Sequence, residues 1–194
     1  MSDSSLYLEF TDAREGGLSK AKTDPACAYP VPDGSGTHTN CGVTYRAFAV
    51  LSSELGYEKS VVNFYDMKEN GIWLKIYNHY WDKSGANLID SQAVANLIFQ
   101  ALWGGGHSNL VRSLQKYFSG KLKVDGQLGQ ITASVVNEMT IKSHIYEKML
   151  MEYLHGERIL YLKSLPAFKL NGKGWMARME KLYELNRNLI SAKR

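Results

Sequence analysis

The sequence predicts a mainly α fold, with any strands short and confined to residues 18–42. From residue 43 onward, apolar residues recur at helical spacing, and glycines interrupt the pattern. Residues 18–42 instead hold three of the four prolines and several glycines, a composition typical of a long loop or a small β-ribbon. A chain of 194 residues is long enough to bury a sizeable core in one compact domain or two small lobes.

The helices are expected in the following order. Residues 5–14 place Leu6, Phe10 and Ala13 on one face. Residues 91–103 show the clearest 3.6-residue stripe; Asp90 is a good cap for it, and the glycines of "GGGH" (104–107) end it. The remaining helices are expected at 43–55, 61–68, 72–81, 109–118, 130–139, about 142–163 and about 175–190, with a turn at "VDGQLG" (124–129).

The composition restricts the partners and the location. The formal net charge of +4 favours anionic partners in general, including an acidic wall polymer, but no block of consecutive basic residues indicates nucleic-acid binding. The start "MSDSSLYLEF" is not a secretory signal, and no run of 18 apolar residues is present. We therefore expect cytoplasmic synthesis without a signal peptide, no membrane insertion, and action on a wall only after release or export.

Two cysteines without a histidine–cysteine cluster predict neither a metal site nor a cofactor. Cys27 and Cys41 lie in the same proline- and glycine-rich segment. Two interpretations stay open: a pair of reduced thiols, or a disulfide that closes the 27–41 loop after export.

The stretch "TDAREGGLSK" (11–20) holds the candidate catalytic acid, Glu15, directly before Gly16 and Gly17. Glycoside cleavage needs a carboxylic acid that protonates the leaving oxygen, and a half-buried glutamate at a helix end beside a cleft suits this role. The two glycines would let a bulky sugar chain approach the backbone. The alternative is an ordinary helix end with a glycine cap.

The segment "EGGLSKAKTDPACAYPVPDGSGTHTNCGVTYRAF" resembles the N-terminal motif of glycoside hydrolase family 108, the lysozyme-like N-acetylmuramidases of phages and bacteria, some labelled putative secretion activators. The matching residues are Glu15-Gly16-Gly17, then Asp33 with Gly36, then Thr39, Gly42, Val43 and Thr44. The resemblance implies a lysozyme-like fold with a long loop or small β-ribbon after the first helix.

Three later segments extend the resemblance: "VDGQLGQIT" (124–132), "ERILYLKSLPAF" (157–168) and "KGWMARM" (173–179) are similar to the predicted peptidoglycan-binding half of these proteins. The resemblance implies a catalytic lobe at 1–89 and a helical, peptidoglycan-binding lobe at 90–194, the two forming one compact unit. The chain departs from the family at Leu18, where a tyrosine is usual, at Gln100, where an acidic residue is common, and in its longer loop after Glu15.

The resemblance implies that Glu15 is the general acid, that Asp33 orients or activates water, and that Thr39 assists. Asp24 competes with Asp33 because it lies at the usual separation from Glu15, and we favour Asp33 for its downstream neighbours. Thr39 has two further interpretations: a cap for the helix expected at 43, or a bond within a turn. Gly16 and Gly17 are expected to contact substrate.

Two other residue types have competing interpretations. Trp103 is a candidate for stacking on a sugar ring, although a tryptophan that closes a helix against a core is the commoner case. His38 and His107 lie near glycines, a setting more typical of surface residues than of substrate contacts.

The function implied is hydrolysis of the β-1,4 bond between N-acetylmuramic acid and N-acetylglucosamine in the glycan strands of peptidoglycan, without metal or organic cofactor. Such an activity is typical of endolysins and other cell-wall hydrolases. The alternatives are a non-catalytic wall-binding or secretion-assisting protein on the same fold, and an enzyme that cuts another N-acetylglucosamine polymer. The sequence leaves open the oligomeric state and whether the reaction inverts or retains the anomeric configuration.

Overall fold

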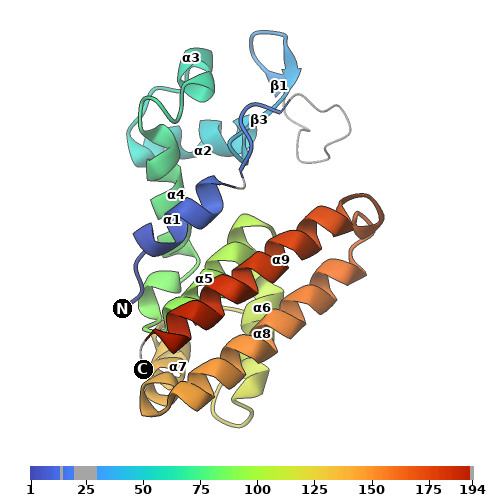
Figure 1. Cartoon of the computed structure of the whole chain (residues 1–194). Coiled ribbons are helices and arrows are strands. Elements are labelled where there is room, and N and C mark those ends of the chain that lie inside the picture. The colour runs from blue at the N-terminus through green and yellow to red at the C-terminus, as the bar shows by residue number, and fades with distance from the viewer. Residues whose placement is uncertain (14, 20–29, 193–194) are drawn as a thin grey trace. The chain divides into compact units, whose positions relative to one another are not determined.

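The computed structural model of the chain (Figure 1) describes residues 1–13, 15–19 and 30–192. Contacts between residues divide the chain into two compact units. Unit 1 comprises Met1–Tyr7 and Tyr80–Arg194, and unit 2 comprises Leu8–His79. The boundary falls inside two helices, α1 (Ser5–Asp12) and α4 (Ile72–Lys83). The boundary at 89/90 that the sequence suggested therefore lies within unit 1.

Unit 2 contains two short antiparallel hairpins followed by helices. The strands β1 (Pro30–Val31) and β2 (Gly36–Thr37) pair Val31 with Gly36, and β3 (Thr39–Asn40) and β4 (Val43–Thr44) pair Asn40 with Val43. The helices α2 (Tyr45–Leu55) and α3 (Val61–Tyr65) follow, before α4. Because the Thr44 side chain accepts from the amide of Ala47, Thr44 caps α2, and the interpretation of Thr39 as a helix cap is wrong.

Aromatic side chains form the core of unit 2. Phe48 from α2 and Phe64 from α3 are fully buried, with ring centroids 5.5 Å apart in an edge-to-face contact. Tyr45 packs edge-to-face on Phe64 at 5.2 Å, and Trp73 of α4 stacks on Tyr77 at 5.5 Å. The Trp73 indole N–H donates to the carbonyl of Cys41, 3.0 Å away, which fixes α4 to the turn between β3 and β4.

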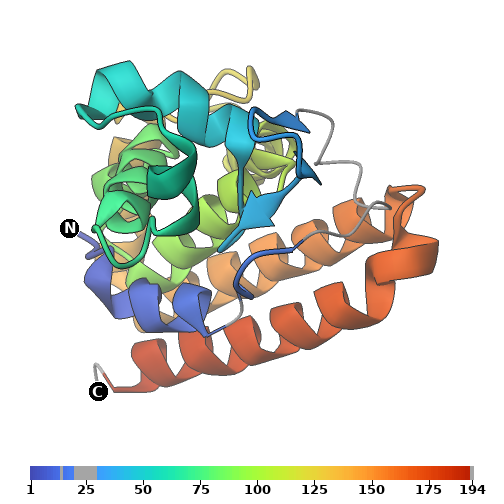
Figure 2. The ribbon, with the colours of Figure 1, turned by 90° about the horizontal axis from the view of Figure 1, so that it is seen from above.

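Unit 1 is built around α5 (Gln92–Trp103), an apolar helix of which ten of the twelve residues are buried. It packs against α6 (His107–Tyr117), α8 (His144–Ser164) and α9 (Phe168–Ser191), and α7 (Gln130–Lys142) packs on α8. Figures 1 and 2 both show α8 and α9 side by side as two long helices. A single 3-10 turn, Ala86–Leu88, precedes α5.

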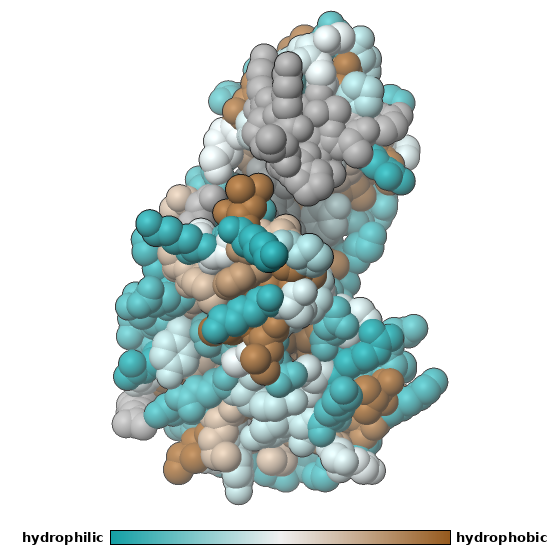
Figure 3. Space-filling view, turned by 90° about the vertical axis from the view of Figure 1, so that its right-hand side faces the viewer, coloured by the Kyte–Doolittle hydropathy of each residue, from teal (hydrophilic) through white to brown (hydrophobic). Residues whose placement is uncertain are grey.

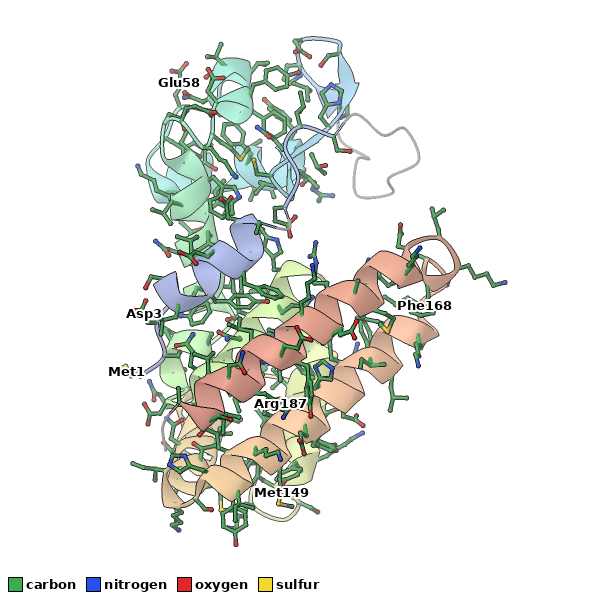
Figure 4. The ribbon with its side chains drawn as sticks, in the orientation of Figure 1. Met1, Asp3, Glu58, Met149, Phe168 and Arg187 are labelled. Atoms are coloured by element: carbon green, nitrogen blue, oxygen red, sulfur yellow. The ribbon has the colours of Figure 1, made fainter. Side chains whose placement is uncertain are left out.

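The first residues of the chain belong to unit 1 through hydrogen bonds of long sequence separation. The Ser2 hydroxyl donates to the carbonyl of Ala86 at 2.7 Å. The amide of Asp3, which Figure 4 marks at the start of α1, donates to Gln92 Oε1 at 2.7 Å. Gln92 Nε2 returns a bond to the Asp3 carbonyl and donates a second to Asn96. The N-terminal segment is thus tied to the buried helix α5.

Several helix boundaries differ from the sequence-based expectation, and for three of them the structure shows the cause. Ser91, and not Asp90, caps α5, since its hydroxyl accepts from the amide of Val94. Ser143 separates α7 from α8 by capping α8. The last helix begins at Phe168, earlier than the expected start near residue 175. The Phe168 ring lies where a side chain at Gly172 would stand, so the packing of this ring accounts for a glycine within the helix.

Arg158 of α8 holds the glycine turn that follows α5. Its side chain is 1% exposed, its Nε donates to Gln100 Oε1 at 2.8 Å, and its two terminal nitrogens donate to the carbonyls of Gly105 and Gly104 at 2.5 and 3.3 Å. Burial lowers the pKa of Arg158 to about 10. A Cβ at Gly106 (φ +93°) would meet the Tyr161 ring and this guanidinium, so glycine is required there.

We expect Arg158→Met to lower the free energy of unfolding by about 2–4 kcal/mol, because the buried Gln100 amide loses its donor and the glycine turn loses two. Chemical denaturation followed by circular dichroism measures the change. The control is Arg187→Met, at an exposed position of α9. Its free energy of unfolding should stay within about 0.5 kcal/mol of that of the parent. An Arg158→Met protein as stable as the parent would contradict this role.

The mainly α, lysozyme-like fold with a small β-ribbon after the first helix is confirmed. On the face shown in Figure 3, hydrophilic residues predominate and hydrophobic ones stand in small groups. Within the described ranges, no helix is both long and apolar enough to cross a membrane.

Candidate functional site

The chain that follows α1 runs beside strand β3. The amide of Ser19 donates to the carbonyl of Thr39 at 2.8 Å, and the amide of Thr39 returns a bond to Ser19 at 3.2 Å. The amide of Cys41 donates to the carbonyl of Gly17 at 3.4 Å. The motif that begins with Glu15 is therefore held on the β3–β4 hairpin by backbone pairing, which places two sequence-predicted elements of the site together.

Glu15 lies against the turn of that hairpin. The turn residues Cys41 and Gly42 both have positive φ, +48° and +78°, as a two-residue type I′ turn requires. The Glu15 carboxylate occupies the space beside the Gly42 Cα: a Cβ built there would stand 2.3 Å from Glu15 Oε2. Only glycine satisfies both the backbone conformation and the close approach of Glu15, whose side chain is half-buried.

Gly16 and Gly17 are exposed, and neither has a positive φ. A Cβ built at either position would have no described atom within 4 Å. Neither the backbone conformation nor packing within the described protein therefore requires glycine there. The two positions leave an unobstructed stretch of backbone next to Glu15.

Asp33 lies in the turn between β1 and β2, and both of its carboxylate oxygens accept hydrogen bonds. Oδ1 accepts from the amide of Ser35 at 2.9 Å and from the Ser35 hydroxyl. Oδ2 accepts from the Tyr65 hydroxyl at 2.8 Å. These bonds favour the charged form and lower the pKa of Asp33 to about 2, the Ser35 hydroxyl making the largest contribution.

A carboxyl with a lowered pKa stabilises the fold only while it is charged. The contribution of Asp33 is complete above its ordinary pKa of 3.8 and is lost as the pH falls through about 2. At neutral pH, Asp33 is therefore a fixed anion in an exposed turn. This state suits the orientation of a water molecule or the stabilisation of positive charge better than the donation of a proton.

The partners of Asp33 form a network that sequence reasoning did not identify. Tyr65 stands at the end of α3, where the Asn40 side chain donates to the carbonyls of Phe64 and Tyr65 at 2.8 Å each. His38 Nε2 and the Ser35 hydroxyl are 2.9 Å apart. His38 is 3% exposed, so the expectation of a surface histidine is wrong. The only signal in the sequence was the short Asp33-to-Ser35 spacing, which is typical of an Asx turn.

Several predicted residues lie elsewhere or outside the description. Asp24 and Cys27 fall outside the described residues. Cys41 is buried, its thiol donates to Asn40 Oδ1 at 3.3 Å, and burial raises its pKa. Thr39 is half-buried in β3, directly opposite Thr44. The assignment of Thr39 to water positioning stays a prediction.

Trp103 belongs to unit 1, where it ends α5 half-buried. Its ring contacts Tyr80 edge-to-face at 5.7 Å and Phe99 at 5.7 Å. The ring therefore serves the aromatic core around α5, and stacking of Trp103 on a sugar stays a prediction. His107 is likewise engaged in unit 1, with Nε2 donating to the carbonyl of Ser84 at 2.8 Å, and burial lowers its pKa.

Metal-ligating side chains do not gather in the described part of the chain: no group of three or more histidine, cysteine, aspartate or glutamate residues there could hold an ion. The candidate reactive groups among the described residues are two carboxyl groups. Glu15 and Asp33 are placed by two successive hairpins of the same unit.

Comparisons with known proteins identify the family and the fold. The sequence matches the family model described as Glycosyl hydrolase 108 over residues 8–106, which is just over half of the chain and includes both carboxyl groups. A solved structure, described as "Structure of Brucella abortus SagA", is similar with a TM-score of 0.72 and 22% identity, over 96% of this chain and 95% of that one. At this identity the likeness shows the fold. Among curated proteins, no significant match is found.

Proposed function

The chain belongs to the glycosyl hydrolase 108 family, and from this premise we propose that it cleaves the β-1,4 bond between N-acetylmuramic acid and N-acetylglucosamine in peptidoglycan. Glu15 is the general acid that protonates the leaving oxygen. Asp33 orients the attacking water, with Thr39 assisting. The protein reaches the wall after release or export.

The observation that supports this function best is the setting of Glu15. Its carboxylate rests on Gly42 in a tight turn, and the exposed backbone of Gly16 and Gly17 continues directly from it. A general acid must be held in place while a bulky polymer approaches it. The Gly42 turn holds Glu15 in place, and the two glycines let the polymer approach it.

The activity is tested by the loss of turbidity of purified sacculi, followed by mass spectrometry of the products. Reducing ends at N-acetylmuramic acid are expected. Cleavage of chitin but not of sacculi would favour another N-acetylglucosamine polymer. Binding to sacculi without any product would favour the non-catalytic, wall-binding alternative. The enlarged loop and Leu18, which is 41% exposed, are the departures from the family pattern that permit this alternative.

The double variant Gly16→Ala/Gly17→Ala should fold with unchanged or slightly higher stability, because open space surrounds both positions and alanine restricts the unfolded chain. Lysis of sacculi should fall by about tenfold or more, since two methyl groups narrow the approach to Glu15. The matched control is Gly174→Ala in α9, also with open space around its Cα, which should leave lysis unchanged. Full lysis by the double variant would contradict the claim that these glycines let the substrate approach Glu15.

A further inference from the structure

A polar pocket lies in unit 1, between α6 and α8. Its volume is about 330 Å³, and its lining includes the side chains of Arg112, Ser113, Lys116, Glu157, Arg158 and Tyr161. All of these residues belong to unit 1, whereas Glu15 and Asp33 belong to unit 2. The pocket and the two carboxyl groups therefore belong to different units.

Charge of both signs lines this pocket. Arg112 and Lys116 are four residues apart on α6, so their side chains share one face of the helix, and both are exposed. Arg158 contributes a third cation from α8. The single anion is Glu157, whose Oε2 accepts from the Ser113 hydroxyl at 2.6 Å. Three cations and one held carboxylate suit a ligand that carries both a negative and a positive group.

The buried guanidinium of Arg158 is the second indication of an anionic ligand. Its hydrogen-bond acceptors are an amide oxygen, from Gln100, and two backbone carbonyls, all of them neutral. Within the described residues, no carboxylate forms an ion pair with it. A buried cation without a counter-charge is costly, and a bound anion would lower that cost.

We propose that this pocket binds the charged end of a peptidoglycan peptide stem, at a residue that carries both carboxylate and ammonium groups. The choice of polymer rests on the proposed function. The carboxylate of the ligand contacts Arg112 and Lys116, and its ammonium group contacts Glu157. The positive charge of Arg158 favours a ligand with a net negative charge. A phosphate polymer would satisfy the cations but would be repelled by Glu157 and would leave that carboxylate without a cationic partner.

The test is calorimetric titration of the full chain with the free tripeptide L-alanyl-γ-D-glutamyl-meso-diaminopimelate. Binding is expected, and Lys116→Gln should weaken it by at least about fivefold, the equivalent of one charge-assisted contact. Lys163→Gln is the matched control, because Lys163 is an exposed lysine of α8 that does not line the pocket. It should leave the affinity unchanged.

Two modified peptides test the two charges. Amidation of the diaminopimelate carboxyls should abolish the difference between the parent and Lys116→Gln. Acetylation of the side-chain amine of diaminopimelate, with the alanine amine left free, should weaken binding to the parent but not to Glu157→Gln. Absence of tripeptide binding, equal losses in Lys116→Gln and Lys163→Gln, or tighter binding of poly(glycerol phosphate) than of the peptide would each overturn the proposal.

The same experiment separates this inference from the proposed activity. The free tripeptide contains no glycosidic bond, so its binding is independent of cleavage, and Glu15→Gln should bind it as the parent does. A protein that lyses sacculi but does not bind the tripeptide would refute only the proposal that the pocket binds a peptide stem. A protein that binds the tripeptide but never releases sugar refutes the hydrolase alone.

Discussion

Glu15→Gln should lower the lysis of sacculi by at least about a hundredfold while the protein stays folded. The amide keeps the size of the carboxyl group and its contact with the Gly42 turn, but it cannot donate the proton that the leaving oxygen needs. Because the side chain is half-buried and the replacement is nearly isosteric, the unfolding midpoint should change little. Turbidity loss and thermal unfolding measure the two effects.

The matched control is Glu9→Gln, the same chemical change at an exposed position of α1 in the same unit. It should leave lysis unchanged, which excludes a general effect of removing one negative charge. A folded Glu15→Gln protein with full lytic activity would falsify the assignment of the general acid and, with it, the enzymatic interpretation of this motif.

Asp33→Asn should be nearly as damaging, whereas Asp24→Asn should be mild. The asparagine keeps an acceptor for Ser35 and a polar group beside Tyr65, so the turn persists, but the fixed negative charge is lost. Lysis assays of the two variants decide between the aspartates. A severe loss of lysis in Asp24→Asn, with lysis unchanged in Asp33→Asn, would reverse the assignment of the second carboxyl group.

The pKa of Asp33 adds a further condition. With a pKa of about 2, this carboxylate stays charged throughout the mildly acidic range, so it should not limit the activity of the folded parent above about pH 4. Inversion of the anomeric configuration, followed by NMR of the first product, is expected if Asp33 orients water for direct attack. Retention would instead make the aspartate a nucleophile.

Much of the helical fold was predictable because its signals are local. The apolar stripe of 91–103 became the buried helix α5, and the glycines after it ended that helix at Trp103. Where the prediction failed, packing overrode a local preference. The sequence predicts the last helix from about residue 175, but α9 begins at Phe168 and includes Gly172 and Gly174, although glycine is a poor helix former. The Phe168 ring fills the space that Gly172 leaves.

The candidate site was predictable only in part, since its contacts join residues that are distant in sequence. The motif identified Glu15 and Asp33, but nothing local predicted that Tyr65, 32 residues away, would bond Asp33. The type I′ turn could not be predicted from the sequence either, because cysteine rarely adopts the positive φ that Cys41 has there. Backbone pairing of Ser19 with Thr39 places the residues that follow Glu15 beside strand β3, although the two paired residues are 20 positions apart in the sequence.

The attachment of the N-terminal residues to α5 affects the order in which the chain folds during synthesis. Unit 2, Leu8–His79, is continuous in sequence and is complete before α5 exists. Asp3, by contrast, bonds a glutamine 89 residues further along. At about 5–20 residues per second, the ribosome needs about 4–18 s to make that partner. The bonds that tie Ser2 and Asp3 to Ala86 and Gln92 can therefore form only after unit 2 has been synthesised, and unit 1 closes last.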